Sequence, residues 1–216
     1  MGVLTKYLQQ REDLLLSVID IDTESIEYLK NEDWISDDQL IEGDFLQTDL
    51  SSLFQEQPFG IIGNFPYNIS TQILFKALDH KDQAIEIVGM FQKEVAERIA
   101  SKAGSKIYGI TSVLLQAYFD IEYLFTVDEN VFDPPPKVKS AVIRLRRNQV
   151  KELACNEKLF KSIVKSSFNQ RRKTLRNSLK PLLKDSIRSL ELFNKRPEQL
   201  SVEDFIGLTN LIETAD

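Results

Sequence analysis

The sequence has very few of the residues that build disulfide frameworks and metal centres. Its 216 residues include one cysteine, Cys155, and one histidine, His80. A single cysteine excludes a disulfide framework within the chain and a metal site built from several cysteines. A single histidine argues against a His-rich metal centre and against a Ser–His–Asp triad. We therefore expect no bound metal.

Long apolar segments are also missing. The sequence contains no run of about 18 apolar residues, so it predicts no membrane-spanning helix. Its first residues lack the apolar stretch of a secretory signal. These absences predict a cytoplasmic protein with no membrane partner. Hydrophobic residues make up 42% of the chain, and the length suits one domain of ordinary size plus a smaller one.

Charge is distributed unevenly along the chain. The formal net charge is −6, from 27 Lys+Arg and 33 Asp+Glu. Residues 1–90 carry 5 basic and 17 acidic side chains, whereas residues 137–180 carry 14 basic and 2 acidic ones. A strongly basic segment in an acidic chain is typical of a surface that binds a polyanion such as nucleic acid. The alternative is a solvated helix face without a partner.

Short β-leaning runs alternate with helical patterns over the first two thirds of the chain. Strands are predicted over 14–20, 39–44, 59–63, 84–91, 121–127 and 139–146, and helices over 3–10, 22–30, 70–78, 92–100 and 108–119. This alternation predicts an α/β fold with a mostly parallel sheet and helices on both faces. Only helical segments follow, over 156–168, 174–183 and 201–213. We therefore expect two domains, 1–148 and 149–216, the second small and all-α.

Acidic residues follow two of the predicted strands, and open α/β sheets bind ligands at the carboxyl ends of their strands. Asp20 and Asp22 are placed to hold the hydroxyls of a ribose, although acids at this position also cap helices. Asp44 could hydrogen-bond an adenine amine while Phe45 lies against the ring, or it could simply form an Asx turn. The residues alone leave these alternatives open.

The tetrapeptide Asn64-Phe65-Pro66-Tyr67 follows a predicted buried strand and precedes a predicted helix. An adenine amine is a poor nucleophile because its lone pair is delocalised into the ring. The Asn64 side-chain oxygen and the Phe65 carbonyl could hold such an amine as two acceptors. Pro66 would stiffen the turn and Tyr67 would stack on the base. This arrangement predicts catalysis by orientation and preorganised dipoles, whereas out of context the tetrapeptide would be an ordinary turn.

Four blocks of sequence carry a resemblance to a known family. They are GNFPYNIS at 63–70, MFQKEVAERI at 90–99, VFDPPPKVKS at 131–140 and FNQRRKTLRNS at 168–178. Together they resemble the ribosomal RNA adenine N6,N6-dimethyltransferase family, and the resemblance runs from residue 1 to 216. It implies a Rossmann-like methyltransferase sheet with a small helical C-terminal domain. It also implies S-adenosyl-L-methionine as cofactor and dimethylation of two adjacent adenosines near the 3′ end of small-subunit (16S) rRNA, a step linked to ribosome maturation.

The resemblance also assigns roles to individual residues. The catalytic set it implies is Asn64, Phe65, Pro66, Tyr67 and Phe132. The cofactor-binding set is Gly2, Asp20, Ile21, Asp44, Phe45 and Asn64. Phe132 would cover the target base on the face opposite Tyr67. Each stacked aromatic would add roughly 1–3 kcal/mol to the binding of the base. No metal is required, because a sulfonium donor transfers its own methyl group.

The basic segment then becomes an RNA-binding surface. Its predicted members are Lys137, Lys139, Arg144, Arg146, Arg147, Arg171, Arg172, Lys173 and Arg176. Phosphate contacts of this kind position RNA without reading its sequence. We expect the partner to be small-subunit rRNA in a pre-30S particle, bound by a monomer.

The start of the sequence departs from the family's pattern. The family's first strand ends in a Gly-rich loop that approaches the cofactor, and Met1-Gly2-Val3-Leu4-Thr5 resembles only the tail of that loop. In this fold the first strand is central, so its loss would leave two neighbouring strands with unpaired edges. Either the sequence begins at an internal methionine, which we favour, or the protein is a variant that binds the cofactor weakly.

Two other functions fit parts of the sequence. The shortened loop suggests a non-catalytic RNA-binding or ribosome-assembly factor. The catalytic motif also fits a large-subunit rRNA adenine methylase that confers antibiotic resistance, but the block at 168–178 favours the small-subunit group.

Overall fold

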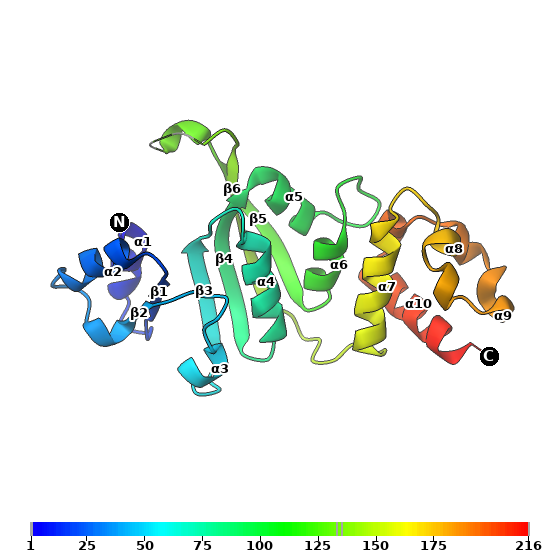
Figure 1. The fold of residues 1–216 in the computed structure, drawn as a ribbon, viewed down its shortest axis with the longest axis horizontal. Coiled ribbons are helices and arrows are strands. Elements are labelled where there is room, and N and C mark those ends of the chain that lie inside the picture. The colour runs from blue at the N-terminus through cyan, green and yellow to red at the C-terminus, as the bar shows by residue number, and fades with distance from the viewer. Residues whose placement is uncertain (1, 133, 135, 216) are drawn as a thin grey trace. The chain divides into compact units, whose positions relative to one another are not determined.

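The computed structural model describes residues 2–132, 134 and 136–215. The chain divides into two compact units, an N-terminal unit over Met1–Gln57 and a C-terminal unit over Pro58–Asp216. The predicted boundary at 148/149 falls within the C-terminal unit and stays a prediction. Figure 1 shows the order of the elements along the chain.

The N-terminal unit is a two-stranded parallel sheet with short helices. Its elements are α1 (Val3–Gln9), β1 (Val18–Asp20), α2 (Thr23–Lys30), a 3₁₀ turn (Asp37–Gln39), β2 (Leu40–Glu42) and α3 (Leu50–Leu53). Ile26 and Leu29 bury the inner face of α2. Asp22 caps that helix by accepting a hydrogen bond from the Ser25 N–H at 3.2 Å. The predicted helix over 22–30 is therefore confirmed.

The first strand is shorter than the sequence predicts. Pairing begins at Val18 instead of residue 14, because β2 offers only three partner residues, opposite Val18, Ile19 and Asp20. Leu15, which was expected inside the strand, is fully exposed. An apolar run alone therefore does not fix where pairing starts.

The C-terminal unit contains a four-stranded sheet in the described residues. Its strands are β3 (Phe59–Asn64), β4 (Ala84–Gln92), β5 (Phe119–Val127) and β6 (Ser140–Arg147), in the order β3-β4-β6-β5. β3 and β4 are parallel, whereas β6 is antiparallel to both β4 and β5. The expectation of a mostly parallel sheet is therefore wrong here. In the described part of the connection from β5 to β6 there is a 3₁₀ turn and no crossover helix, which suits the antiparallel pairing of the two strands.

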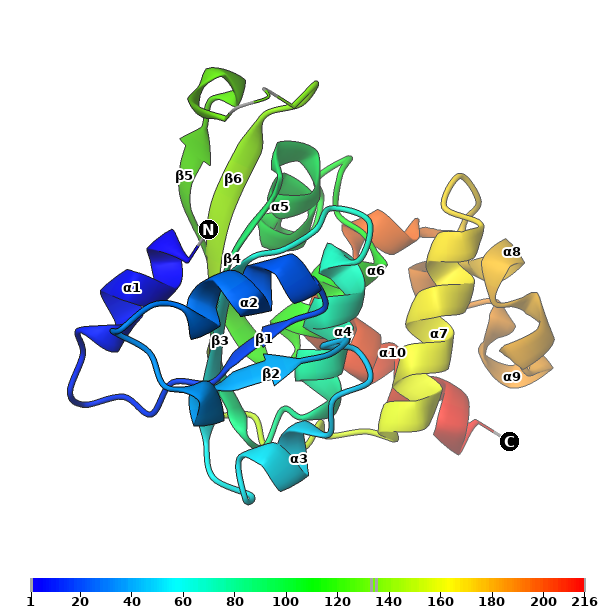
Figure 2. The ribbon, with the colours of Figure 1, turned by 60° about the vertical axis from the view of Figure 1, so that its left-hand side comes forward.

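Three helices pack on this sheet (Figures 1 and 2): α4 (Ser70–Asp79), α5 (Lys93–Ala100) and α6 (Ile110–Gln116). The fully buried side chains Ile87, Ile143 and Leu145 alternate with more exposed neighbours along β4 and β6. Every second residue of a strand points to the same face, so this alternation gives the sheet one covered, apolar side.

The remaining elements of the C-terminal unit are helical. They are α7 (Glu157–Asn169), α8 (Leu175–Ser178), α9 (Asp185–Arg188) and α10 (Val202–Thr214), with 3₁₀ turns at Glu129–Val131, Lys180–Leu182, Glu191–Asn194 and Pro197–Gln199. Helices α7 and α10 pack on each other and on α6. The predicted capping box of Ser201 and Asp204 is present. The helix expected over 174–183 is broken, because Pro181 cannot donate to a preceding turn.

Four of the described strands, β1, β2, β3 and β5, lie at sheet edges. Within the described residues, β1 pairs only with β2, and β3 pairs only with β4. The expectation that a missing first strand leaves two neighbouring strands unpaired stays a prediction. Among the same residues, no helix combines the length and apolar character needed to cross a membrane.

Candidate functional site

The target loop, residues 64–67, continues directly from β3. Asn64 is the last residue of that strand and lies opposite Met90 of β4. Its side chain is exposed and makes no hydrogen bond to any described residue. A side-chain amide held at the end of a strand, with its oxygen unused, can accept a hydrogen bond from a ligand amine.

The two aromatic residues of the target loop are anchored in different ways. The Phe65 ring is 8% exposed and meets Phe91 edge-on, with ring centroids 5.5 Å apart. Tyr67 is half-buried, and its hydroxyl shares a 2.5 Å hydrogen bond with the Oγ of Ser140, the first residue of β6. The loop therefore presents Asn64 outward while its aromatic residues hold it to the sheet.

Phe132, the second predicted stacking residue, follows the 3₁₀ turn after β5. It is half-buried. Its neighbours Asp133 and Pro135 lie outside the described residues. The base sandwich between Tyr67 and Phe132 stays a prediction.

The two residues predicted to bind the ribose and the adenine of the cofactor lie at the carboxyl ends of the strands of the N-terminal sheet. Asp20 ends β1, and Asp44 follows β2 by two residues. The Oδ1 atom of Asp20 accepts from the Asp22 N–H at 3.0 Å, and that of Asp44 from the Leu46 N–H at 2.8 Å. The Asx turn considered for Asp44 is thus present.

These turns leave the second carboxylate oxygen of each residue available. Neither Oδ2 of Asp20 nor Oδ2 of Asp44 bonds to a described residue. A carboxylate with a free oxygen can accept a hydrogen bond from a ribose hydroxyl or an adenine amine. These two acceptors therefore fit the nucleoside part of S-adenosylmethionine. The Asx turn and a ligand role are therefore compatible in Asp44.

The other predicted cofactor residues are placed differently. Gly2 has a φ of 65° at the start of α1, where a Cβ would meet Leu29 at 2.8 Å. It lines a hollow of about 400 Å³ with Trp34, and neither Asp20 nor Asp44 lines that hollow. Ile21 is exposed and Phe45 is half-buried beside Asp44. Asn64 belongs to the C-terminal unit.

The predicted basic surface is partly neutralised by carboxylates. Arg144 forms ion pairs with Glu122 and Glu86, and Arg146 Nε lies 3.2 Å from Glu86 Oε1. These residues face one another across β4, β6 and β5. Lys139 pairs in the same way with Asp128 at 3.3 Å and with Glu129, whereas Lys137 is exposed without an ion pair in the described chain.

Arg147 is held by backbone carbonyls. Its guanidinium donates to the carbonyls of Lys81, Tyr118, Asn148 and Val150. It also lies 5.5 Å above the Tyr118 ring. Burial, together with a hydrogen bond to Glu157, raises the pKa of Tyr118. This guanidinium therefore links the last residue of β6 to the backbone of residues 81, 118, 148 and 150.

The basic residues of the helical segment are more open. Arg172 and Lys173 are exposed and unpaired in the described chain, whereas Arg171 donates to the Lys106 carbonyl and Arg176 to Asn194 at 2.9 Å. The sequence prediction missed the lysine row, an exposed set on α7 made of Lys158, Lys161 and Lys165. Spacings of three and four residues place these lysines on one helix face, a signal already readable in the sequence.

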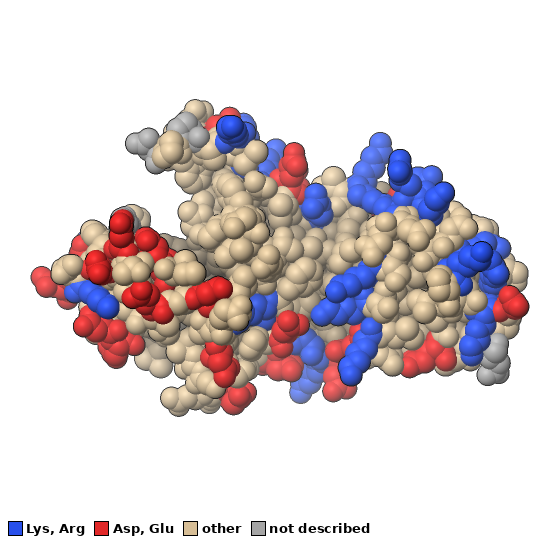
Figure 3. Space-filling model, in the orientation of Figure 1, with Lys and Arg blue, Asp and Glu red and all other residues tan. Residues whose placement is uncertain are grey.

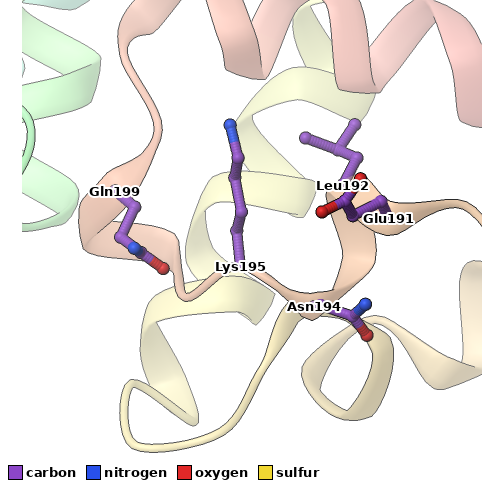
Figure 4. A pocket seen from close by; sticks show the side chains of 5 residues that line it. All are labelled: Glu191, Leu192, Asn194, Lys195 and Gln199. Atoms are coloured by element: carbon purple, nitrogen blue, oxygen red, sulfur yellow. The ribbon is translucent and has the colours of Figure 1, made fainter.

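On the face drawn in Figure 3, the charged side chains of the N-terminal unit are mostly acidic, and those of the helices from α7 onward are mostly basic. A hollow of about 520 Å³ lies at the 3₁₀ turns Glu191–Asn194 and Pro197–Gln199. It is lined by Glu191, Leu192, Asn194, Lys195 and Gln199 (Figure 4). None of these side chains was predicted to bind anything. Within the described residues, no group of three or more metal-ligating side chains is gathered.

The fold and the loop together define an α/β methyltransferase. The chain is similar to a dimethyladenosine transferase from Plasmodium falciparum, with a TM-score of 0.76, 24% identity, and coverage of 98% of this chain and 86% of the other. It is also similar to the 23S rRNA methyltransferase ErmE, with a TM-score of 0.66, 22% identity, and coverage of 97% and 87%. At these identities the likeness shows the fold alone.

Sequence relatives narrow the class. The profile of the family described as "Ribosomal RNA adenine dimethylase" matches residues 1–213. A "Ribosomal RNA small subunit methyltransferase A" from Bacteroides thetaiotaomicron is 59% identical over 100% of this chain and 81% of its own length. One from Cytophaga hutchinsonii is 60% identical over 98% and 82%. The chain belongs to the ribosomal RNA adenine dimethylase family, which confirms the predicted fold class and S-adenosylmethionine as its methyl donor.

Proposed function

We propose that this protein dimethylates the N6 amines of two adjacent adenosines near the 3′ end of 16S rRNA. The observation that carries the proposal is the target loop, in which an exposed Asn64 amide without an internal partner stands beside an anchored Tyr67. The relatives from Bacteroides thetaiotaomicron and Cytophaga hutchinsonii, both named as small-subunit methyltransferases, support the choice of rRNA.

The chemistry follows from the groups that the loop supplies. The Asn64 Oδ1 and the Phe65 carbonyl accept hydrogen bonds from the target amine and orient its lone pair. Tyr67, fixed by Ser140, stacks on the adenine ring. Asp20 and Asp44 would hold the nucleoside of S-adenosylmethionine, which would supply an activated methyl group on a sulfonium. The rate gain comes from orientation and preorganised dipoles, without a covalent intermediate.

The RNA surface combines Arg172, Lys173 and Lys137 with the lysine row. These cations are exposed and unpaired in the described chain, so they can meet phosphates without first breaking an ion pair. We expect the substrate to be folded small-subunit rRNA in a pre-30S particle, recognised largely by shape and bound by a monomer.

Methyl transfer to ribosomal particles tests the proposal. Labelled S-adenosylmethionine is incubated with the protein and with small-subunit particles that lack N6 methylation. We expect four methyl groups per particle, located in two adjacent adenosines, and none in particles that are already dimethylated. Absence of transfer would indicate a non-catalytic RNA-binding factor, and transfer to large-subunit rRNA would indicate the other methylase group.

The role of Asn64 gives a sharper prediction. Asn64→Ala should lower the rate of transfer by roughly 10²–10³-fold, the usual cost of losing one preorganised hydrogen-bonding group at a reacting centre. The dissociation constant for RNA should stay within twofold, because the side chain is exposed, carries no charge and makes no hydrogen bond to a described residue. Single-turnover rates and filter binding measure both quantities; an unchanged rate would contradict the assignment.

A further inference from the structure

Two glycines face each other beneath the target loop. Gly63 of β3 lies opposite Gly89 of β4 in the parallel register, next to the pair Ile61 and Ile87 on the covered side of the sheet. Neither has a positive φ, since among the described glycines only Gly2 and Gly104 do. Any residue could therefore adopt the backbone conformation at both positions. What restricts a side chain there is the space above the two glycines.

The Phe65 ring occupies that space. A Cβ on Gly89 would lie 2.3 Å from Phe65 Cε2, 2.7 Å from Phe65 Cδ2 and 2.8 Å from Phe91 Cε2. A Cβ on Gly63 would lie 2.8 Å from Phe65 Cε1. One side of the ring thus covers Gly89 and the other covers Gly63. The ring cannot move aside easily, because Phe91, itself fully buried, packs against it at 5.5 Å.

We infer that Gly89 is a positioning residue for methyl transfer: the Gly63–Gly89 pair is a seat for the Phe65 ring, and the seat fixes the two acceptors that hold the target amine. Asn64 and the Phe65 carbonyl lie directly beside the seated ring in the chain, so a displacement of the ring moves both. The inference rests on the proposed function, but Gly89 lies on β4, whereas the target loop continues from β3.

A double-mutant cycle tests the seat. Gly89→Ala should lower the single-turnover rate at least tenfold while leaving the dissociation constant for RNA within twofold. In a Phe65→Ala background, which keeps the backbone carbonyl but removes the whole ring, Gly89→Ala should change the rate less than about threefold, because Phe91, which the Cβ would also meet, can then move into the vacated space. Equal effects in the two backgrounds would overturn the inference, since contacting residues couple and independent ones add.

A matched control lies on the same strand as Gly63. A Cβ on Gly60 would meet only the Glu86 carbonyl oxygen, at an ordinary 3.6 Å. Gly60→Ala should therefore leave the rate unchanged. If Gly89→Ala alone does not fold, a Phe65→Ala/Gly89→Ala protein that folds and transfers like Phe65→Ala supports the seat. A double variant that fails to fold although Phe65→Ala folds would show that Phe91, and not Phe65, sets the limit at Gly89, and would refute the seat.

A readout without substrate separates this inference from the proposed function. The Asn64 side-chain amide has its own NMR resonances, identified by their loss in Asn64→Ala. They should shift in Gly89→Ala and stay fixed in Gly60→Ala. The shift that Gly89→Ala causes should be clearly smaller in a Phe65→Ala background than in the wild type. A wild-type protein without transfer activity would refute the proposed function, whereas resonances unmoved by Gly89→Ala would refute the seat.

Discussion

Ser140 has no exposed surface, and its hydroxyl is hydrogen-bonded to Tyr67, a residue 73 positions earlier in the chain. The bond fixes the rotation of the Tyr67 ring at the place where the target base should stack. Loss of one such bond removes about 1 kcal/mol of interaction, and the stacking geometry should loosen with it.

Removing either partner of this bond should therefore have the same effect. Ser140→Ala and Tyr67→Phe should each lower kcat/KM several-fold, and the double variant should be no worse than either single one. Steady-state kinetics on undermethylated particles measure the three values. Additive losses would mean that the two hydroxyls act independently.

Tyr108 gives a pH-dependent prediction. Burial, with Glu203 and Asp204 nearby, raises its pKa to about 12. The folded state thus favours the neutral phenol: its contribution to stability is fully present below the unfolded pKa of about 10 and is lost as pH rises through 12. Over that window the loss amounts to roughly 3 kcal/mol.

Replacing Tyr108 with phenylalanine should remove this loss. Urea unfolding of wild type and Tyr108→Phe at pH 9 and pH 11 isolates the contribution, because all other titrating groups are shared. The wild type should lose more unfolding free energy than the variant between the two values. Equal losses would show that the phenol titrates normally.

At the scale of elements, β6 shows how one strand uses its arginines in two ways. Arg144 and Arg146 lie in a row of ion pairs with carboxylates of the flanking strands, whereas Arg147 closes the strand's end by binding carbonyls. Exposed ion pairs contribute little to stability, while a guanidinium that satisfies several carbonyls contributes more.

Stability should therefore respond unequally to alanine at these positions. Arg147→Ala should lower the unfolding free energy by about 2 kcal/mol, and Arg144→Ala by less than about 1 kcal/mol. Lys137→Ala, which breaks no ion pair in the described chain, serves as the control. Urea titration measures all three. A stable Arg147→Ala protein with weakened RNA binding would favour the phosphate contact predicted from sequence.

The elements themselves were largely predictable, because apolar spacing records which face of a helix or strand is buried. The chain from α4 to β4 and the capping box at Ser201 follow from such local patterns. Pairing direction does not: nothing near Ile143 indicates that β6 enters between β4 and β5. The partners of Arg144 and Arg147 depend on that register. The sequence therefore could not show that these two basic side chains are already bound to carboxylates and backbone carbonyls.

The candidate site was predictable in the same limited way. The target loop is a continuous motif, so Asn64 and Tyr67 could be found from sequence alone. Ser140 and Gly89 act across strands, and only the register brings them to the loop. Sequence reasoning therefore finds the residues that contact a ligand before those that hold them in place.

At the scale of the whole molecule, the unpaired cations give the last prediction. Reversing Lys158, Lys161 and Lys165 to glutamate should reduce the salt dependence of RNA binding by a slope of about 2, since each phosphate contact adds roughly 0.7–0.9. Lys30→Glu, in the acidic N-terminal unit, should leave the slope unchanged. Filter binding across a salt series gives both slopes. An unaltered slope in the triple variant would exclude the lysine row from the RNA surface.

The central position of β6 also bears on how the protein is made. This strand is the last of its sheet to be synthesised, yet it lies between β4 and β5. Glu86 can bind Arg146, which is 60 residues later in the chain, only after β6 has been made. Pairings so distant in sequence form late, because loop closure comes before any contact that rewards it. While the chain is still emerging from the ribosome, the hydroxyl of Tyr67 has no Ser140 to bind. The target loop should therefore acquire its final geometry only after the strand that holds it has been translated.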